Sequence, residues 1–122
     1  MNRRWIALLF LLGATTPDHA AEQEPTLFRW PTVSRTQVVF SYADDLWIVS
    51  REGGEAKRLT SMAGDKTYPL FSPDGTLVAF TSQTRSGQDV YVVPVAGGSP
   101  RRLTYHPWSD ETSGWTRDGK SV

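Results

Sequence analysis

The sequence predicts an all-β fold built from four-stranded units that repeat along the chain. The main observation is an internal duplication: residues 45–60 align without a gap on residues 89–104, with seven of the sixteen positions identical. The same 44-residue offset places Phe71 and the Ser-Pro-Asp-Gly turn after it on Trp115 and residues 116–119. Beyond the N-terminal apolar run, no segment shows a sustained helical period of apolar residues, and Gly, Pro, Asp and Ser interrupt the chain often.

The unit at residues 67–104 is complete and predicts four short strands separated by turns. Its first strand ends at a turn in which Pro73 fixes the backbone dihedral φ and Gly75 takes the left-handed position. The third strand is almost continuously apolar, which is typical of a strand covered on both faces, and the polar fourth strand suits an outer edge. The predicted strands lie at 67–71, 76–82, 89–93 and 101–104, with a polar hairpin loop at 84–88 and a glycine turn at 96–98.

The first unit, about residues 27–60, repeats this order with a weaker first turn at Ser34 and Arg35. Its second strand is predicted at 37–42. Phe40 and Phe80 are 40 residues apart, whereas the segments that follow them are 44 apart, so the hairpin of the first unit is four residues shorter. Insertions at a loop tip cost little, so this difference is compatible with the repeat.

A third unit begins at about residue 112 and stops at Val122, inside its second strand. Four-stranded units at this spacing are blades of a β-propeller. The sequence therefore predicts an incomplete β-propeller over residues 22–122, with two blades and the start of a third. About three repeats are needed before such a core is continuous, so we expect this chain to be a fragment of a longer protein.

The first 21 residues predict a secretory signal peptide. Arg3 and Arg4 precede an apolar run at residues 5–12, and Ala20 and Ala21 offer small residues for cleavage. The run is shorter than the roughly 20 residues that a spanning helix needs. We therefore expect export to the periplasm or the medium by the general secretion route, with an uncleaved membrane anchor as the alternative. The chain has no cysteine, which excludes a lipoprotein anchor and any disulfide.

The charge balance argues against nucleic acid as a partner. The formal net charge is zero, from 13 basic and 13 acidic residues, so there is no basic excess for phosphate contacts. The glycine pairs at 53–54 and 97–98 do not open a helix and are not followed by the Lys-Ser/Thr of a phosphate-binding loop. Such pairs are expected to be hairpin turns with positive φ.

Two sets of polar residues invite a catalytic or metal-binding interpretation. Ser72, Asp74 and His106 could be read as a triad, but Ser72 and Asp74 share one tight turn and His106 precedes a proline in a loop. Asp44 and Asp45 could bind a cation, but Asp45 recurs as Asp89 at the same place in the next unit. Recurrence favours a structural role, here a hydrogen bond near the turn, and a hard cation needs more converging oxygens.

The remaining candidates have structural interpretations as well. The basic cluster is expected to be solvated charge on edge strands, where it blocks edge-to-edge pairing; its members are Arg58, Arg101 and Arg102. The large rings Trp47, Tyr91 and Trp115 could line a ligand site but are expected to form the core between blades. No catalytic, cofactor-binding or metal-binding residue is assigned in this chain, and no cofactor is expected.

The repeat itself resembles a known family. Its elements are similar to the propeller repeats shared by the Tol-system periplasmic propeller protein and tricorn-type proteases; they lie at 71–75, 78–80, 89–92, 97–98 and 101–104. The wider order resembles the start of the N-terminal six-bladed propeller of bacterial tricorn protease homologues: a signal peptide, then residues 28–31, 44–47, 102–107 and 114–120. This resemblance covers roughly residues 27–122 and departs at Arg117, where the family usually has Pro, and at Ser34-Arg35.

The resemblance implies that a second propeller, a PDZ-like domain and a serine-peptidase core follow, with the catalytic residues far downstream. It implies a role in gating peptide access or as a scaffold. The implied partners are the remaining blades and catalytic domains, peptide substrates and other copies in a homo-oligomer. One alternative is a Tol-type binding module, although only a short segment separates the signal peptide from the first blade, where that family has an α/β domain. Another is the propeller of a prolyl-oligopeptidase-like or amidohydrolase enzyme, which a downstream nucleophile elbow or His cluster would reveal.

Overall fold

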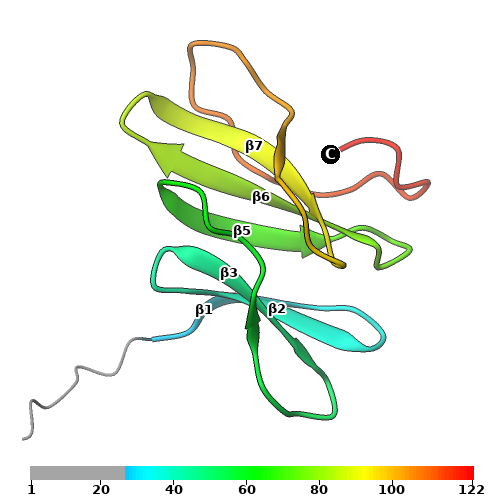
Figure 1. The fold of residues 1–122 in the computed structure, drawn as a ribbon. Helices are drawn as coiled ribbons and strands as arrows, with labels where there is room; N and C mark the ends of the chain where they lie inside the picture. The colour runs from blue at the N-terminus through cyan, green and yellow to red at the C-terminus, as the bar shows by residue number, and fades with distance from the viewer. Residues whose placement is uncertain (1–26) are drawn as a thin grey trace, which may run out of the picture.

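The computed structural model describes residues 27–122, and the predicted signal peptide lies outside these residues. The described chain contains two four-stranded antiparallel sheets and no helix (Figure 1). Blade 1 has the order β1-β2-β3-β4, with the strands β1 (Arg29–Val33), β2 (Gln37–Tyr42), β3 (Asp45–Ser50) and β4 (Lys57–Arg58). Blade 2 repeats it as β5-β6-β7-β8, with β5 (Asp65–Phe71), β6 (Leu77–Thr84), β7 (Gly87–Pro94) and β8 (Arg101–Arg102). The predicted all-β fold and partial propeller are confirmed.

The two blades meet along their first strands. The backbones of the two sheets come closest where β5 of blade 2 lies beside β1, β2 and β3 of blade 1. Within residues 27–122, the backbones of β4 and β8 lie farther from the other sheet. The sheets therefore converge at β1 and β5, which we call the inner edge, and diverge toward β4 and β8. This is the arrangement of neighbouring propeller blades around an axis.

The hairpin between the second and third strands differs from the prediction. In blade 1 its tip is Ala43-Asp44, between the paired residues Tyr42 and Asp45. In blade 2 its tip is residues 85–86, between the paired residues Thr84 and Gly87. The predicted loop at 84–88 was therefore too long, and the four extra residues of blade 2 lengthen its strands. A two-residue turn is a favoured hairpin connection. Adding two residues to each of the two strands keeps that turn unchanged.

The fourth strands are shorter than predicted because the chain turns back at their ends. After β8 the backbone N–H of Leu103 donates to the carbonyl of Val90 at 2.8 Å, and the Val90 N–H donates to Oγ1 of Thr104 at 3.0 Å. The same bonds occur in blade 1, from Leu59 to Leu46 at 2.7 Å and from the Leu46 N–H to Thr60 at 3.0 Å. Each predicted Arg-Leu-Thr strand is thus a two-residue strand followed by a side-chain cap.

The hydrophobic core lies between the two blades. The side of blade 1 that packs on blade 2, which we call the rear face, contributes Val39, Leu46 and Ile48, and the crossover after β4 contributes Leu59. The opposite side of a blade is its front face, and the front face of blade 2 packs on these residues with Val78, Phe80 and Val93, each 0% exposed. The rear face of blade 2 is covered by the chain after β8, since the Thr112 N–H donates to Oγ1 of Thr81 at 2.8 Å. Within the described residues, blade 2 is therefore covered on both faces and blade 1 on one face only.

The crossover from β4 to β5 requires glycine at one position. Gly64 has φ +95°, and a Cβ there would lie 2.2 Å from the carbonyl oxygen of Gln83.

No helix within residues 27–122 is long and apolar enough to span a membrane.

Candidate functional site

The inner edge carries the least ordinary backbone of the described chain. Trp30 in β1 and Tyr68 in β5 have φ values of 55° and 51°, and each precedes a proline. Both lie where the pairing register of the strand shifts by a bulge. Positive φ is uncommon for bulky residues, and such strained backbone is concentrated at functional sites. Its occurrence at the same place in both blades makes the inner edge the candidate site.

The two strained residues touch each other across the seam between the blades. The ring centroids of Trp30 and Tyr68 are 4.2 Å apart with tilted planes, and Trp30 remains 39% exposed. Beside them, Arg29 of blade 1 pairs with Asp65 of blade 2 at 3.4 Å, both partly exposed. The inner edge thus presents an aromatic pair next to an ion pair, a combination that can contact both apolar and charged parts of a peptide.

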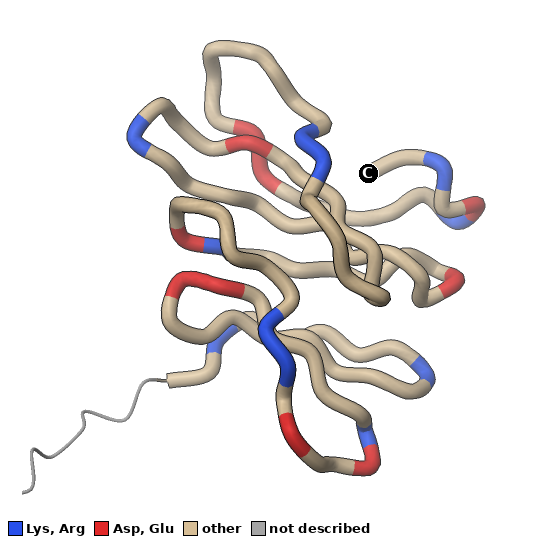
Figure 2. The backbone as a smooth tube through the Cα atoms, in the orientation of Figure 1, with Lys and Arg blue, Asp and Glu red and all other residues tan. Residues whose placement is uncertain are grey.

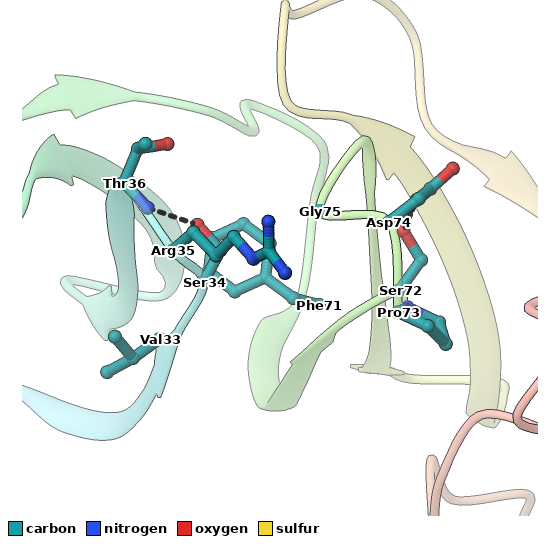
Figure 3. Close-up of a pocket in the computed structure, with 9 residues that line it drawn as sticks. All are labelled: Val33, Ser34, Arg35, Thr36, Phe71, Ser72, Pro73, Asp74 and Gly75. Atoms are coloured by element: carbon teal, nitrogen blue, oxygen red, sulfur yellow. Dashed lines mark hydrogen bonds between the residues drawn. The ribbon is translucent and has the colours of Figure 1, made fainter.

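A groove of about 660 Å³ lies between the first turns of the two blades (Figure 3). One wall is the turn of blade 1 at residues 33–36 and the other is the turn of blade 2 at 71–75. In blade 1, Oγ of Ser34 accepts the Thr36 N–H at 3.3 Å, and Arg51 donates to the Ser34 carbonyl at 3.3 Å. The groove is therefore walled by turns with internal hydrogen bonds.

The turn of blade 2 depends on Asp74. Its carboxylate accepts the Ser72 hydroxyl at 2.6 Å, the Thr76 N–H at 3.0 Å and the Thr76 hydroxyl at 2.8 Å. The Ser72 hydroxyl and then the Thr76 groups hold the pKa of Asp74 below its ordinary value. The start of the third unit has the same turn, where Asp118 accepts the Thr116 hydroxyl at 2.6 Å and its pKa is lowered mainly by that bond.

The residues of the suggested triad do not form one. Ser72 donates to Asp74 inside their shared turn. His106 lies after β8, where its Nδ1 is 3.5 Å from the carboxylate of Asp110. Ser72 and His106 share no hydrogen bond, so these three residues do not have the serine–histidine–aspartate order of bonds that a triad needs.

The two adjacent acids play different roles. Asp44 is exposed at the hairpin tip, where its φ is 66°. Asp45 is 4% exposed and accepts hydrogen bonds from Nε of Arg58 at 2.8 Å and from the Thr60 hydroxyl at 2.8 Å. Nζ of Lys66 in blade 2 lies 3.2 Å from the same carboxylate. Within the described residues, no cluster of three His, Asp or Glu could hold a metal ion.

The environment of Asp45 favours its charged form. Burial raises its pKa, but hydrogen bonds from Thr60, Arg58 and Lys66 together outweigh burial and hold the pKa below the ordinary value. Lys66 is 1% exposed and also donates to the carbonyls of Gly64 at 2.5 Å and of Met62. The buried cation is thus fully paired.

This arrangement recurs in blade 2 and corrects two predictions. Asp89 accepts Nη2 of Arg102 at 2.7 Å and the Thr104 hydroxyl at 3.3 Å. The recurring Asp therefore fastens its strand to the Arg and Thr at the end of the fourth strand, and the predicted bond near the turn was wrong. Arg58 and Arg102 are partners of these acids, and only Arg101 of the three is an exposed charge without such a bond. We call each Asp-Arg-Thr set a clasp.

The glycine pairs are hairpin turns, as predicted. Gly53, Gly54, Gly97 and Gly98 all have positive φ. The first glycine of each pair closes its turn by donating to a carbonyl three residues earlier, at 3.0 Å in both blades.

The three large rings are placed differently from one another. Tyr91 stacks on Phe80 and packs against the core between the blades. Trp47 is the equivalent residue of blade 1, and it is half-buried on the front face, away from the core between the blades. Its Nε1 donates to the Tyr42 carbonyl of its own blade at 3.1 Å. Trp115 matches Phe71 and donates to the Leu70 carbonyl of blade 2 at 3.0 Å. Of these three rings, Tyr91 and Trp115 therefore join one unit to its neighbour in the described chain, and Trp47 does not.

The aromatic pair at the inner edge was missed because its signal has another spacing. Trp30-Pro31 and Tyr68-Pro69 are both aromatic-proline dipeptides, but they are 38 residues apart instead of 44. An alignment made with one fixed offset does not superpose them. Acidic and basic positions are interspersed along the backbone of both blades (Figure 2).

Comparisons with known proteins agree with this architecture. Residues 25–122 match the family described as "Tricorn protease N-terminal beta propeller domain". The chain is 36% identical over 112 residues to "Tricorn protease homolog 1" of Streptomyces coelicolor, which is 89% of this chain and 10% of that protein. The crystal structure of the tricorn protease matches with a TM-score of 0.66 and 25% identity, over 79% of this chain and 10% of that one.

The fold is also similar to that of TolB from Acinetobacter baumannii, with a TM-score of 0.65 and 23% identity. That match covers 75% of this chain and 25% of the TolB chain, and it shows the fold alone. The chain spans about a tenth of the length of the tricorn relatives it matches.

Proposed function

The chain belongs to the tricorn protease N-terminal β-propeller family, and on that premise we propose that it controls the access of peptides to a catalytic domain elsewhere in a longer serine peptidase. The observation that carries this proposal is the family match over residues 25–122. The matched region is about a tenth of each tricorn relative, so we assign peptide-bond hydrolysis to residues outside this region.

The inner edge supports a role in passing peptides. In a propeller the first strands surround the axis, so a peptide moving along the axis passes β1 and β5. Trp30 and Tyr68 offer flat apolar surface with little loss of side-chain freedom, because the bulged backbone and their mutual contact already order them. The Arg29–Asp65 pair next to them can exchange its bonds with a charged group or a peptide terminus.

We further propose that the parent protein is exported. The support is the signal-peptide pattern of residues 1–21. N-terminal sequencing of the protein recovered from the periplasm or medium tests this. A mature N-terminus close to residue 22 is expected, and recovery of the intact N-terminus from the cytosol would contradict export.

The gating role is tested on the complete polypeptide that carries this chain, by measuring kcat/KM for peptides of increasing length. The variant is Trp30→Asn with Tyr68→Asn, since Asn tolerates positive φ and removes only the rings. We expect kcat/KM for long peptides to change by about tenfold relative to short peptides, which is about 1.4 kcal/mol in the transition-state free energy. Trp108→Asn, at a Trp that is 75% exposed outside the inner edge, is the matched control.

Two results would count against this function. An unchanged length profile in the double variant would show that the inner edge does not contact the passing peptide. Absence of any peptidase activity sensitive to serine-directed inhibitors, with stable capture of a protein partner instead, would favour a binding module of the Tol type.

A further inference from the structure

The first turns of the three units lie in one row and touch one another. These turns are residues 33–36 of blade 1, 72–75 of blade 2 and 116–119 of the third unit. A Cβ at Gly75 would lie 3.6 Å from Cβ of Ser34, and a Cβ at Gly119 would lie 3.4 Å from Cδ of Pro73. Because the first strands of a propeller surround its axis and β1 and β5 lead into these turns, the row forms part of the rim at one mouth of the axial channel. We call this row the turn rim.

Two of the three turns carry an exposed arginine. Arg35 lies in the turn of blade 1, and Arg117 lies in the turn of the third unit. The 44-residue offset of the repeat places Pro73 of blade 2 on Arg117, and blade 2 forms the same hydrogen-bonded turn with proline. The turn therefore does not need arginine for its own structure. In the described chain, neither Arg35 nor Arg117 forms an ion pair.

The acidic groups of the turn rim are held by their own turns. The carboxylate of Asp74 accepts its three hydrogen bonds from Ser72 and Thr76. The carboxylate of Asp118 accepts the Thr116 hydroxyl at 2.6 Å and the backbone N–H of Lys120 at 3.2 Å. These bonds fold both carboxylates back onto the backbone, so the guanidinium groups of the rim are the groups that can take an anion from outside the chain.

The groove between the first two turns combines positive charge with apolar surface. Arg35 extends from the turn of blade 1 into the space between the turns, beside Phe71 (Figure 3). Val33 and Pro73 add exposed apolar surface to the two walls. Arg51 donates to the backbone carbonyl of Arg35 at 3.4 Å, which places a second guanidinium group at the same turn. This lining fits a ligand that carries a carboxylate next to an apolar group.

The placement of the two arginines favours a peptide over a small anion. The turn of blade 2 touches the turn of blade 1 on one side and the turn of the third unit on the other, so Arg35 and Arg117 are held on either side of it. An extended peptide with several acidic side chains can pair with both arginines, and each pair can form two parallel hydrogen bonds. The apolar side chains of the same peptide can occupy the groove.

We propose that the turn rim binds acidic peptides, with Arg35 and Arg117 pairing with their Asp or Glu side chains, and that acidic peptides are thereby preferred at this mouth of the channel. The entry of these peptides into the channel rests on the proposed gating function, whereas their binding to the rim does not. Binding is therefore measured without cleavage, so that the two proposals can fail separately.

The test compares two peptides that bind to the complete polypeptide after treatment with a serine-directed inhibitor. One peptide carries Glu residues between apolar residues, and the other has Gln in place of each Glu. Both have an amidated C-terminus and the same uncharged fluorophore, so only side-chain carboxylates differ. From fluorescence anisotropy we expect the Glu peptide to bind about tenfold more tightly at low salt. This preference should shrink at high salt, because exposed charges are screened.

Substitutions then test the two arginines. In Arg35→Gln with Arg117→Pro, the second change installs the residue that blade 2 has there, and we expect the preference for the Glu peptide to fall to about twofold or less. Arg35→Lys with Arg117→Lys keeps both charges without the planar guanidinium groups and should give an intermediate preference. The matched control is Arg85→Gln with Arg101→Gln, which removes two exposed positive charges from a hairpin tip and an outer strand and should leave the preference unchanged.

Because all four arginines are exposed, these variants are expected to stay folded, which thermal unfolding verifies; Arg117→Gln replaces Arg117→Pro if proline disturbs the turn. Equal binding of the two peptides by the original protein would overturn the proposal. A preference that survives the loss of Arg35 and Arg117 would place the binding site elsewhere and would also overturn it. An equal loss of preference in the control would reduce the effect to net charge, with the same consequence. The length profile of Trp30→Asn with Tyr68→Asn tests gating separately.

Discussion

Blades 1 and 2 have the same strand order and the same clasp, but they are buried to different extents. Phe80 in blade 2 is fully buried, whereas Phe40, its equivalent in blade 1, is only half-buried. The clasp of blade 1 also receives Lys66 from the next blade, and within residues 27–122 the clasp of blade 2 receives no such cation. Each blade therefore forms its own Asp-Arg-Thr clasp, while its core and its ionic balance depend on the neighbour.

The largest difference between the blades is expected at the clasps. Asp45→Ala leaves the buried Lys66 and the partly exposed Arg58 without their anion. Because the charge of Lys66 is then buried without a carboxylate, we expect a loss of about 3–5 kcal/mol in the free energy of unfolding. Asp89→Ala leaves only Arg102, whose side chain is 37% exposed and can be solvated, so the loss should be about 1–3 kcal/mol. Denaturant titration of the complete polypeptide measures both.

Asp44→Asn is the control for these variants, since Asp44 is exposed and Asn tolerates its positive φ. Equal losses for Asp45→Ala and Asp89→Ala would show that Lys66 adds nothing to the first clasp.

The second comparison uses the paired phenylalanines. Phe80→Ala should cost about 3–5 kcal/mol, because a fully buried ring leaves a cavity. In a complete propeller a neighbouring blade is expected to cover Phe40 as well, so in the complete polypeptide Phe40→Ala should cost nearly as much. Thermal unfolding of the two variants measures the difference. A Phe40→Ala cost below about 1 kcal/mol would indicate that this face stays open to water.

The connection between the blades is expected to tolerate less than a turn within a blade. Gly64→Ala combines a positive φ with a clash against the Gln83 carbonyl, so we expect a loss of about 2–4 kcal/mol. Gly53→Ala has a similar φ but no atom within 4 Å of the added Cβ, and about 1–2 kcal/mol is expected. Chemical denaturation of both variants gives the values, and similar losses would contradict the close approach at Gly64.

The smallest effect is the pH dependence of the clasp in blade 1. Because the pKa of Asp45 is lower in the folded protein than its ordinary value, the ionised clasp contributes stability above about pH 4. This contribution is lost as the pH falls through the folded pKa of Asp45. We expect the stability difference between the original protein and Asp45→Asn to shrink as the pH is lowered from 6 to about 2. A constant difference across this range would contradict the assignment.

Much of the fold could be predicted because the repeat reports it directly. Recurrence of the Asp, glycine-pair and Arg-Leu-Thr segments at one offset defined the four-stranded units. The clasp was not predicted, although Asp45 and Arg58 recur as Asp89 and Arg102, because the contact depends on the register between the third and fourth strands. Lys66 could not be found from the repeat, since no other unit has a lysine at its position: the 44-residue offset places it on Asp110, and the strand register places it on Phe28.

The inner edge was also hidden from sequence reasoning. The bulges that bring Trp30 and Tyr68 together come from the local pairing of each first strand with the second. An aromatic-proline dipeptide does not by itself indicate positive φ, because the residue before proline normally takes an extended conformation. Only the paired strands hold these two residues in the strained form.

The clasp also bears on how the protein emerges from the ribosome. Asp45 and Arg58 are 13 residues apart, so the first clasp joins residues that leave the exit tunnel almost together. Contacts of such short range form early, because little chain entropy is lost in closing them. Lys66 is synthesised only after the clasp can close, and its arrival marks the first strand of the next blade. The nascent chain can therefore add blades one at a time, each prepared to receive its successor.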